Sequence, residues 1–520
     1  MDSHDSRNRF VRGVVVGWIA HACGIAVTFF TTPIVVLELG DVAYGVWSVV
    51  ISLTGYYALF DLGLGKAASK YVAQFHGQED VDSIRRVVAT TQVAYLQLSL
   101  VLAIATIFAA WCVPHIFSVD VVRDHEIRWV VLLVGLRMAS MLLSSPYRAA
   151  MEGYQRFDIS TAIAIGSQTC SAALVVVVLR LGGRIVHLGV SACVIGVLTD
   201  LILWQVAVHL LGLPRFRLSD SDSKTRNTML GFGALTVLAN CARGMGQKTS
   251  MIVAAALAGP TVVAHFAIAD SIVDKVLRLG KPIAQATMPS CSRLRARSRD
   301  AEICRLVEIA MRVLTAMGLS FSVTLWLFGR EFVGHWIVPE FASHCAPSIF
   351  LLATSLIATL PGNAAIEVMQ GVGHARLSAI CGVAEAALMI LLSALMVASL
   401  GSVGLGIAVL IPIALIRGVV LPIVMCMAIG MSLRRYVTNV VGAALCASAP
   451  GVIIGLSMKA CIATPNLVVV MCVIGINVGV SCLIVAYVGL PKSAWVALMA
   501  TVVRRRKGAA LRKNGEYVSS

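Results

Sequence analysis

Seven charged residues fall within two neighbouring apolar stretches of the chain, residues 230–257 and 261–289. A charge at the centre of a bilayer costs at least ~2.5–3.5 kcal/mol, so such side chains are expected to face a hydrated, protein-lined cavity and to bind a partner there. Five of the seven are cations, which predicts an anionic ligand. The seven residues are Arg243, Lys248, Asp270, Asp274, Lys275, Arg278 and Lys281.

The spacing in the first stretch predicts a polar helical stripe. Asn240, Arg243 and Gln247 follow one another at i, i+3 and i+7, which places them on one face of a helix near its middle. Lys248 lies off this stripe and is expected to face a different neighbour. We predict that Arg243 and Lys248 contact an anionic headgroup or a sugar substituent.

The second stretch predicts a charge network. Asp270, Asp274 and Arg278 fall at i, i+4 and i+8, so Asp274 can pair with Arg278 on its own helix. Lys275 points away from this row. Two roles stay open for these four residues, an internal ion-pair network or the coupling of charge movement to the cargo.

A third candidate lies earlier in the chain. Arg137, Ser140, Ser144 and Arg148 share one helical stripe within an apolar stretch. We include Arg137 among the cations expected to bind substrate.

The elements that must position these residues are membrane-spanning helices. Of the 520 residues, 58% are hydrophobic and 13% charged, whereas a soluble protein has about 25% charged residues. Apolar stretches of about 20 residues, enough for one helical crossing of a bilayer, recur along the chain. We predict an all-α, polytopic membrane protein with about fourteen transmembrane helices, the first of them retained rather than cleaved as a signal peptide. The predicted spans are residues 14–37, 43–62, 87–111, 129–147, 159–179, 185–211, 230–257, 261–289, 306–328, 347–370, 377–400, 404–429, 437–458 and 467–488.

The distribution of basic residues predicts the orientation. Lys and Arg are concentrated in alternate loops, which places those loops and both termini in the cytoplasm and requires an even number of spans. Fourteen spans meet this requirement, and twelve would also. The net charge of +16 is therefore explained by cytoplasmic anchors, and a nucleic-acid partner is not indicated.

The sequence gives little support for a metal site, a cofactor or catalysis. Most of the 14 cysteines lie within predicted spans, and no CxxC or HExxH spacing occurs, so we predict no metal site and no cofactor. A membrane enzyme such as a sugar polymerase or a glycosyltransferase would need a large outer loop or a catalytic cluster, and the predicted outer loops are short. We therefore predict that the protein is not an enzyme.

The two halves of the chain contain a short repeat. Residues 62–68 read LGLGKAA and residues 277–283 read LRLGKPI, each after a short outer loop and before a charged cytoplasmic segment. Transporters built from two such halves place the substrate site between them.

A series of motifs occupies residues 32–73. They are Thr32-Pro33-Ile34, Leu39-Gly40, Tyr44-Gly45-Val46-Trp47, Gly55-Tyr56, Asp61-Leu62-Gly63-Leu64 and Lys70-Tyr71-Val72-Ala73. In this order and spacing the region resembles the N-terminal part of polysaccharide-biosynthesis flippases. These are the O-antigen, capsule and exopolysaccharide repeat-unit transporters of the multidrug/oligosaccharidyl-lipid/polysaccharide exporter superfamily.

The resemblance implies an architecture. Two six-helix lobes around a central cavity would comprise residues 1–211 and 230–429, with a cytoplasmic linker at 212–229. Two additional transmembrane helices within 430–488 and a basic cytoplasmic tail at 489–520 would follow.

The resemblance also implies a function. An undecaprenyl-diphosphate-linked oligosaccharide would move from the inner to the outer leaflet of the bacterial cytoplasmic (inner) membrane by alternating access. The expected partners are this lipid-linked substrate and the bilayer, with the polysaccharide polymerase and chain-length machinery as further candidates. A cationic cavity suits a diphosphate, because charge-assisted hydrogen bonds are strong where the dielectric constant is low.

Four residues are expected at the cytoplasmic mouth. Asp61 belongs to the Asp-Leu-Gly motif of the family. Lys66, Lys70 and Lys281 lie near predicted cytoplasmic helix ends, where they either meet the incoming diphosphate or extend toward lipid headgroups.

Two other transport functions stay open. A flippase for a lipid-linked peptidoglycan precursor is a close relative, and only the motifs of residues 32–73 argue against it. A cation-coupled drug antiporter of the same superfamily should place carboxylates in its cavity, and the cations predicted here would repel its cargo.

The sequence generates one direct test. Replacing Arg243 by Ala should abolish the export of surface polysaccharide while the protein still inserts into the membrane, because the anionic group would lose its midplane cation. Export is measured on cells, and insertion by immunoblotting of the membrane fraction. Normal export in the variant would contradict the predicted site.

Overall fold

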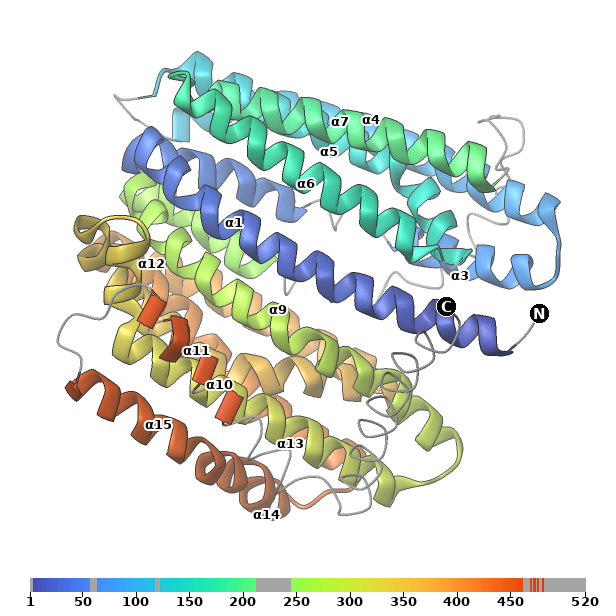
Figure 1. The fold of residues 1–520 in the computed structure, drawn as a ribbon, viewed down its shortest axis with the longest axis vertical. Helices are drawn as coiled ribbons and strands as arrows, with labels where there is room; N and C mark the ends of the chain where they lie inside the picture. Colours follow the sequence, from blue (N-terminus) through green and yellow to red (C-terminus); the bar gives the residue numbers. More distant parts are fainter. Residues whose placement is uncertain are drawn as a thin grey trace, which may run out of the picture. The chain divides into compact units, whose positions relative to one another are not determined.

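The protein is an assembly of long helices (Figure 1). The computed structural model describes residues 3–56, 63–116, 122–154, 156–211 and 245–461, together with short helical pieces between residues 468 and 480. These residues contain no strand, and nine of their helical segments are long and apolar enough to cross a membrane. The prediction of an all-α, polytopic membrane protein is confirmed, while the number of fourteen spans stays a prediction.

The helices follow the order of the predicted spans. Those of the first part are α1 (Ser3–Leu53), α3 (Leu64–Gly77), α4 (Val81–Ile116), α5 (Asp124–Gly153), α6 (Phe157–Arg180) and α7 (Ile185–Leu211). Residues 245–258 are helical. The later helices are α9 (Pro260–Ala296), α10 (Asp300–Trp336), α11 (Pro339–Gly371), α12 (Ala375–Leu415), α13 (Leu421–Ile429), α14 (Leu433–Tyr436) and α15 (Ala443–Cys461). π-Helical turns occupy Ile416–Val420 and Val437–Gly442.

Two glycines divide the longest helices between predicted spans. Gly40 has φ 73° and ψ 171° within α1, and Gly401 has φ 56° and ψ −129° within α12. Residues with a side chain avoid such positive φ values, whereas glycine adopts them readily. The chain of α1 turns back on itself (Figure 1), and Gly40, its non-helical residue, lies between the predicted spans 14–37 and 43–62. Gly401 likewise separates the predicted spans 377–400 and 404–429.

The structure divides into two compact units. The first comprises Met1–Arg278, Gly329–Ser355 and Ala375–Ile416, and the second comprises Leu279–Phe328, Leu356–His374 and Arg417–Ser520. The two lobes expected from the resemblance stay a prediction. The expected linker, residues 212–229, and the expected tail, residues 489–520, lie outside the described residues.

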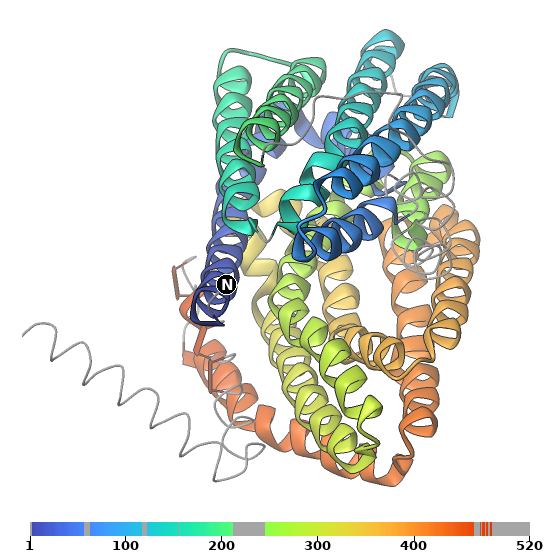
Figure 2. The ribbon, with the colours of Figure 1, turned by 90° about the vertical axis from the view of Figure 1, so that its right-hand side faces the viewer.

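In the first unit, α4, α5, α6 and α7 lie side by side (Figure 2). α5 packs against α4 and α7, and α6 packs against α1 and α7. The approach of α5 to α4 depends on Gly135, since a Cβ atom there would lie 2.1 Å from Cγ2 of Thr106. Small residues of this kind let helices in a membrane approach closely. α5 thus packs closely against α4, and its contact with α7 allows polar side chains of these two helices to meet.

The second unit contains its own buried ion pair. Glu308 of α10 is 6% exposed, and Arg435 of α14 donates a hydrogen bond from Nε to its carboxylate. Arg312 donates to the backbone carbonyl of Asn439 and lies 4.0 Å from the Glu308 carboxylate. Arg417 donates to the side-chain oxygen of Asn363 over 3.0 Å. The contacts of Glu308 and Arg312 join α14 and the following turn to α10, and that of Arg417 joins the turn at Ile416–Val420 to α11.

Candidate functional site

Several of the predicted site residues lie outside the described residues. Asn240, Arg243 and Asp61 lie outside the described residues, so the predictions for them are untested. Lys66, Lys70 and Lys281 are exposed. None of these three is in the lining of the three cavities described below, and their place at the mouth stays a prediction.

Lys248 has a carboxylate partner. Its Nζ lies 3.4 Å from Oδ2 of Asp270, and Gln247 donates from Nε2 to Oδ1 of Asp270 over 2.6 Å. Each oxygen of Asp270 therefore contacts one side chain of the same helix. Gln247 and Lys248 are consecutive residues, so their side chains leave that helix in different directions and meet at Asp270. Gly55 allows the lysine stem to pass, because a Cβ there would lie 3.0 Å from Cγ of Lys248. Tyr56 shares a hydrogen bond of 2.7 Å with Thr249.

The Gly55-Tyr56 motif thus fixes the helix that carries Lys248. This helix borders a cavity of about 270 Å³, which we call the Lys248 cavity. Its polar lining is formed by Thr31, Thr32, Tyr44, Trp47, Ser48, Ser52, Lys248 and Asp270.

Lys275 differs from the other cavity cations. Its Nζ donates to the backbone carbonyl of Ser271 over 2.9 Å, and among the described residues no carboxylate lies within ion-pair distance of it. Arg278, by contrast, pairs through Nε with Oδ2 of Asp274 over 2.7 Å, as their i, i+4 spacing predicts. Asp274 and Arg278 are 48% and 53% exposed. Their charges are therefore open to a ligand that approaches Lys275.

These three residues line a second cavity of about 300 Å³, which we call the Lys275 cavity. The remaining lining residues are Gly24, Ile25 and Thr28 of α1, Gln168 of α6 and Ser271 of α9. Two cations, one carboxylate, an amide and two hydroxyl groups thus surround one small space.

The stripe on α5 converges on a single carboxylate of α7. Asp200 is 5% exposed, and its Oδ2 lies 2.6 Å from Nη1 of Arg137 and 2.7 Å from Oγ of Ser140. Oδ1 accepts a hydrogen bond of 2.8 Å from Ser144 and lies 3.8 Å from Nη2 of Arg148. One carboxylate therefore faces two guanidinium groups. Arg137 is predicted to bind substrate, but its closest partner is the protein's own Asp200.

Sequence reasoning did not connect Asp200 with this stripe. Asp200 is the only acidic residue of α7, and a lone carboxylate in an apolar span indicates that a partner exists. Helical spacing relates residues of one helix only. It therefore could not show that this partner lies on α5.

Gly196 makes room for the Arg137 side chain. A Cβ at Gly196 would lie 1.8 Å from Nε of Arg137, so any other residue there would displace the guanidinium. Gly196 precedes Asp200 by one helical turn on α7, which places it directly beneath the ion pair.

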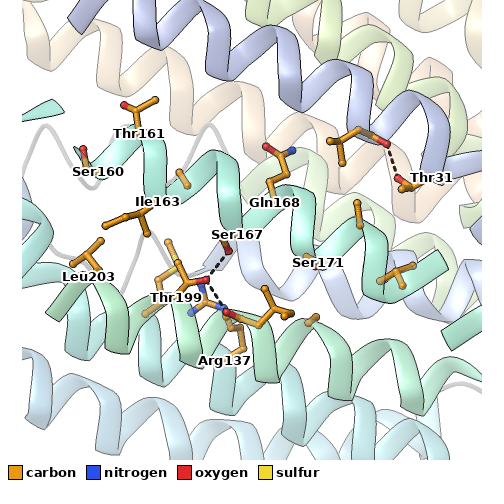
Figure 3. A pocket seen from close by; sticks show the side chains of 18 of the residues that line it. Thr31, Arg137, Ser160, Thr161, Ile163, Ser167, Gln168, Ser171, Thr199 and Leu203 are labelled. Atoms are coloured by element: carbon orange, nitrogen blue, oxygen red, sulfur yellow. Dashed lines mark hydrogen bonds between the residues drawn. The ribbon is translucent and has the colours of Figure 1, made fainter. Parts of the chain in front are cut away.

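A cavity of about 790 Å³ lies beside this ion pair (Figure 3) and is lined by α1, α5, α6 and α7. We call it the large cavity. Thr199 of α7 and Ser167 of α6, which both line it, share a hydrogen bond of 2.6 Å. Its polar and aromatic lining consists of Thr31, Trp47, Arg137, Arg148, Glu152, Ser160, Thr161, Ser167, Gln168, Ser171 and Thr199.

The three cavities share lining residues. Gln168 lines both the large cavity and the Lys275 cavity, and Thr31 and Trp47 line both the large cavity and the Lys248 cavity. All three spaces therefore adjoin one another along α1. Thr28 and Thr31 donate their hydroxyl protons to the α1 carbonyls of Gly24 and Val27. Their oxygen lone pairs stay available to accept hydrogen bonds from a ligand.

The role of Gly196 can be tested by comparison with Gly166. Gly196→Ala should lower the free energy of unfolding by about 1–3 kcal/mol, since overpacking displaces buried groups. Gly166 is the matched control, because a Cβ there meets nothing within 4 Å. Gly166→Ala should leave stability unchanged or raise it by up to about 1 kcal/mol, since alanine favours helix. Thermal unfolding of the purified variants gives both values, and equal stability of the two would contradict the packing argument.

The sequence of this chain matches a known protein family. A family model described as polysaccharide biosynthesis protein matches residues 11–295, more than half of the chain. The search of curated proteins gives no significant match.

Solved structures share the fold. The lipid II flippase MurJ in an inward closed conformation is 10% identical, with a TM-score of 0.71 over 92% of this chain and 98% of that one. A multidrug resistance MATE family transporter of the MOP superfamily, inward-facing, is 16% identical, with a TM-score of 0.65 over 79% and 94%. A MOP superfamily transporter from Pyrococcus furiosus Vc1 (DSM3638), whose structure is described as having a binding pocket of reverse polarity, is 15% identical, with a TM-score of 0.61 over 80% and 95%. The chain belongs to the polysaccharide biosynthesis protein family and has the fold of the MOP superfamily transporters.

Proposed function

We propose that the protein is a flippase for undecaprenyl-diphosphate-linked oligosaccharide repeat units. It would move them from the inner to the outer leaflet of the bacterial cytoplasmic membrane by alternating access, with both termini in the cytoplasm. The exported units would serve the synthesis of O-antigen, capsule or exopolysaccharide. The family match and the shared fold of flippases and transporters support this proposal.

The Lys275 cavity is the observation that carries the proposal. The Lys275 ammonium is hydrogen-bonded to one backbone carbonyl, which leaves two of its three donors for a ligand. A phosphate entering the cavity would replace water at Lys275 without first breaking an ion pair. Charge-assisted hydrogen bonds to phosphate are short and strong in a space of low dielectric constant.

Neighbouring groups suit the second phosphate of a diphosphate. Arg278 presents a guanidinium on the same cavity, and Thr28 and Gln168 add a hydroxyl and an amide. Asp274 pairs with Arg278, so two cations and one carboxylate line this cavity. A transporter must release its cargo as well as bind it, and a partly compensated site serves both steps better than a fully cationic one.

The two alternatives predict different chemistry or different phenotypes. A cation-coupled drug antiporter would have to bind its cargo at carboxylates that already pair with cations here, Asp270 with Lys248 and Asp274 with Arg278. A peptidoglycan-precursor flippase would handle the same diphosphate on a different sugar. The fold of MurJ keeps that function as the second candidate.

Deletion in the host distinguishes the three functions. Loss of surface polysaccharide with normal growth and unchanged drug resistance is the expected result, because only repeat-unit export would stop. Depletion that leads to cell lysis would instead indicate the peptidoglycan precursor. Increased sensitivity to cationic drugs with intact polysaccharide would indicate the antiporter.

The role of Lys275 can be tested in proteoliposomes. Lys275→Ala should reduce the flipping of undecaprenyl diphosphate bearing an oligosaccharide by about 10- to 100-fold, since one hydrogen bond to a charged group contributes about 1.5–3 kcal/mol. Lys275→Arg should retain most of the activity, because the positive charge stays in the cavity. Flipping is measured by the accessibility of a fluorescent cargo to a quencher outside the vesicles. Wild-type rates in the alanine variant, at equal reconstitution, would overturn the proposed diphosphate site.

A further inference from the structure

We infer that the large cavity binds the sugar portion of the cargo while the adjoining Lys275 cavity holds its diphosphate. This inference rests on the proposed function. It names a second ligand site, for carbohydrate, formed by α1, α5, α6 and α7 within the first unit.

The lining of the large cavity has the chemistry of a carbohydrate site. Sugars present many hydroxyl groups and an apolar ring face, so they are bound by uncharged donors and acceptors together with an aromatic side chain. Thr161 and Ser171 of α6 place hydroxyl groups on this cavity, and Trp47 of α1 adds an aromatic surface. The charged residues Arg137, Arg148 and Glu152 also line it. Indole combines a large apolar face with one polar N–H group. Figure 3 shows that the labelled hydroxyl and amide groups come mostly from one side of α6.

The size of the cavity also fits a carbohydrate. Its volume of about 790 Å³ is within the range of about 300–1,000 Å³ that small-molecule sites occupy. The Lys275 cavity measures about 300 Å³. The smaller space therefore suits a compact charged group, and the larger one suits sugar rings.

Gln168 lies at the junction of the large cavity and the Lys275 cavity. In a lipid-linked sugar the diphosphate is bonded directly to the first sugar ring, so their sites must be adjacent. Among the described residues, Gln168 is the one side chain that lines both cavities. A carboxamide carries two donors and an acceptor, so it can serve a phosphate oxygen and a sugar hydroxyl at once.

Gly24 sets the position of this junction. A Cβ at Gly24 would lie 3.2 Å from both Oε1 and Nε2 of Gln168. The carboxamide therefore rests against the bare Cα of α1, directly between the two cavities. A larger residue at Gly24 would push it out of this position.

The experiment separates sugar binding from diphosphate binding. The full-length protein in nanodiscs is titrated with two ligands, undecaprenyl diphosphate and the lipid-linked repeat unit extracted from a host that lacks this protein. The ratio of the two dissociation constants gives the affinity gained from the sugar. Thr161→Val/Ser171→Ala removes two hydroxyl groups that line only the large cavity. Thr169→Val is the matched control, since Thr169 lies on the same helix, bonds to the carbonyl of Ile165 and does not line the cavity.

The expected result is a loss of the sugar contribution alone. The double variant should reduce the affinity gained from the sugar by about tenfold, the effect of two neutral hydrogen bonds, and bind undecaprenyl diphosphate as the wild type does. Thr169→Val should behave as the wild type with both ligands. Lys275→Ala should weaken both ligands by the same factor. Trp47→Leu provides a second variant of the sugar site that does not depend on α6.

Two outcomes would overturn the inference, and they are distinguishable from failure of the proposed function. If the wild type binds both ligands equally, or if the double variant and Trp47→Leu keep the full gain from the sugar, the large cavity does not bind sugar and the diphosphate site stands. If the wild type binds neither ligand, the proposed flippase function fails and the sugar site fails with it.

Discussion

The cost of placing charge inside a bilayer governs the arrangement of this protein. Asp200 is 5% exposed and is met by two guanidinium groups and two hydroxyl groups. Glu308 in the second unit is met by Arg435 and Arg312. Leaving a buried charge without its partner costs about 3–5 kcal/mol, so each of these pairs holds its helices together. Lys275 differs from these groups, because its ammonium donates to a backbone carbonyl and has no carboxylate within ion-pair distance among the described residues.

α1 gives the first unit its functional surface. One polar row along this helix, from Gly24 through Thr28 to Thr31, borders all three cavities in turn. Its threonine hydroxyl groups bond to their own backbone, so they add polarity without needing a partner on another helix. Glycines bring the neighbours close, with Gly24 against Gln168 and Gly55 against Lys248. A ligand in any one cavity therefore contacts a helix that the other two share.

The sequence predicts features that depend on neighbours along the chain. The turn at Gly40 and the pair of Asp274 with Arg278 follow from local spacing and from the conformational freedom of glycine, and both are present. Contacts between helices cannot be predicted in this way. Periodicity indicates which face of a helix a residue occupies, but it does not identify the helix that packs against that face. Two such contacts are visible only in the structure. They are the pairing of Arg137 with Asp200, and the contacts of Gln247 and Lys248 with Asp270. Gln168 carries no charge and belongs to no motif, so nothing in the sequence marked it.

The fold alone does not determine what such a protein carries, since a flippase and a drug transporter both share it at low identity. The cargo must be selected by which charges a cavity leaves uncompensated. In this chain the carboxylates Asp270 and Asp274 are each bound to a cation, whereas Lys275 is not bound to a carboxylate among the described residues. A cationic ligand would have to break an existing ion pair to bind, while an anionic ligand would only displace water. That asymmetry favours an anionic cargo on energetic grounds, independently of the family match, and the hydroxyl-lined space beside Lys275 favours one that carries sugar.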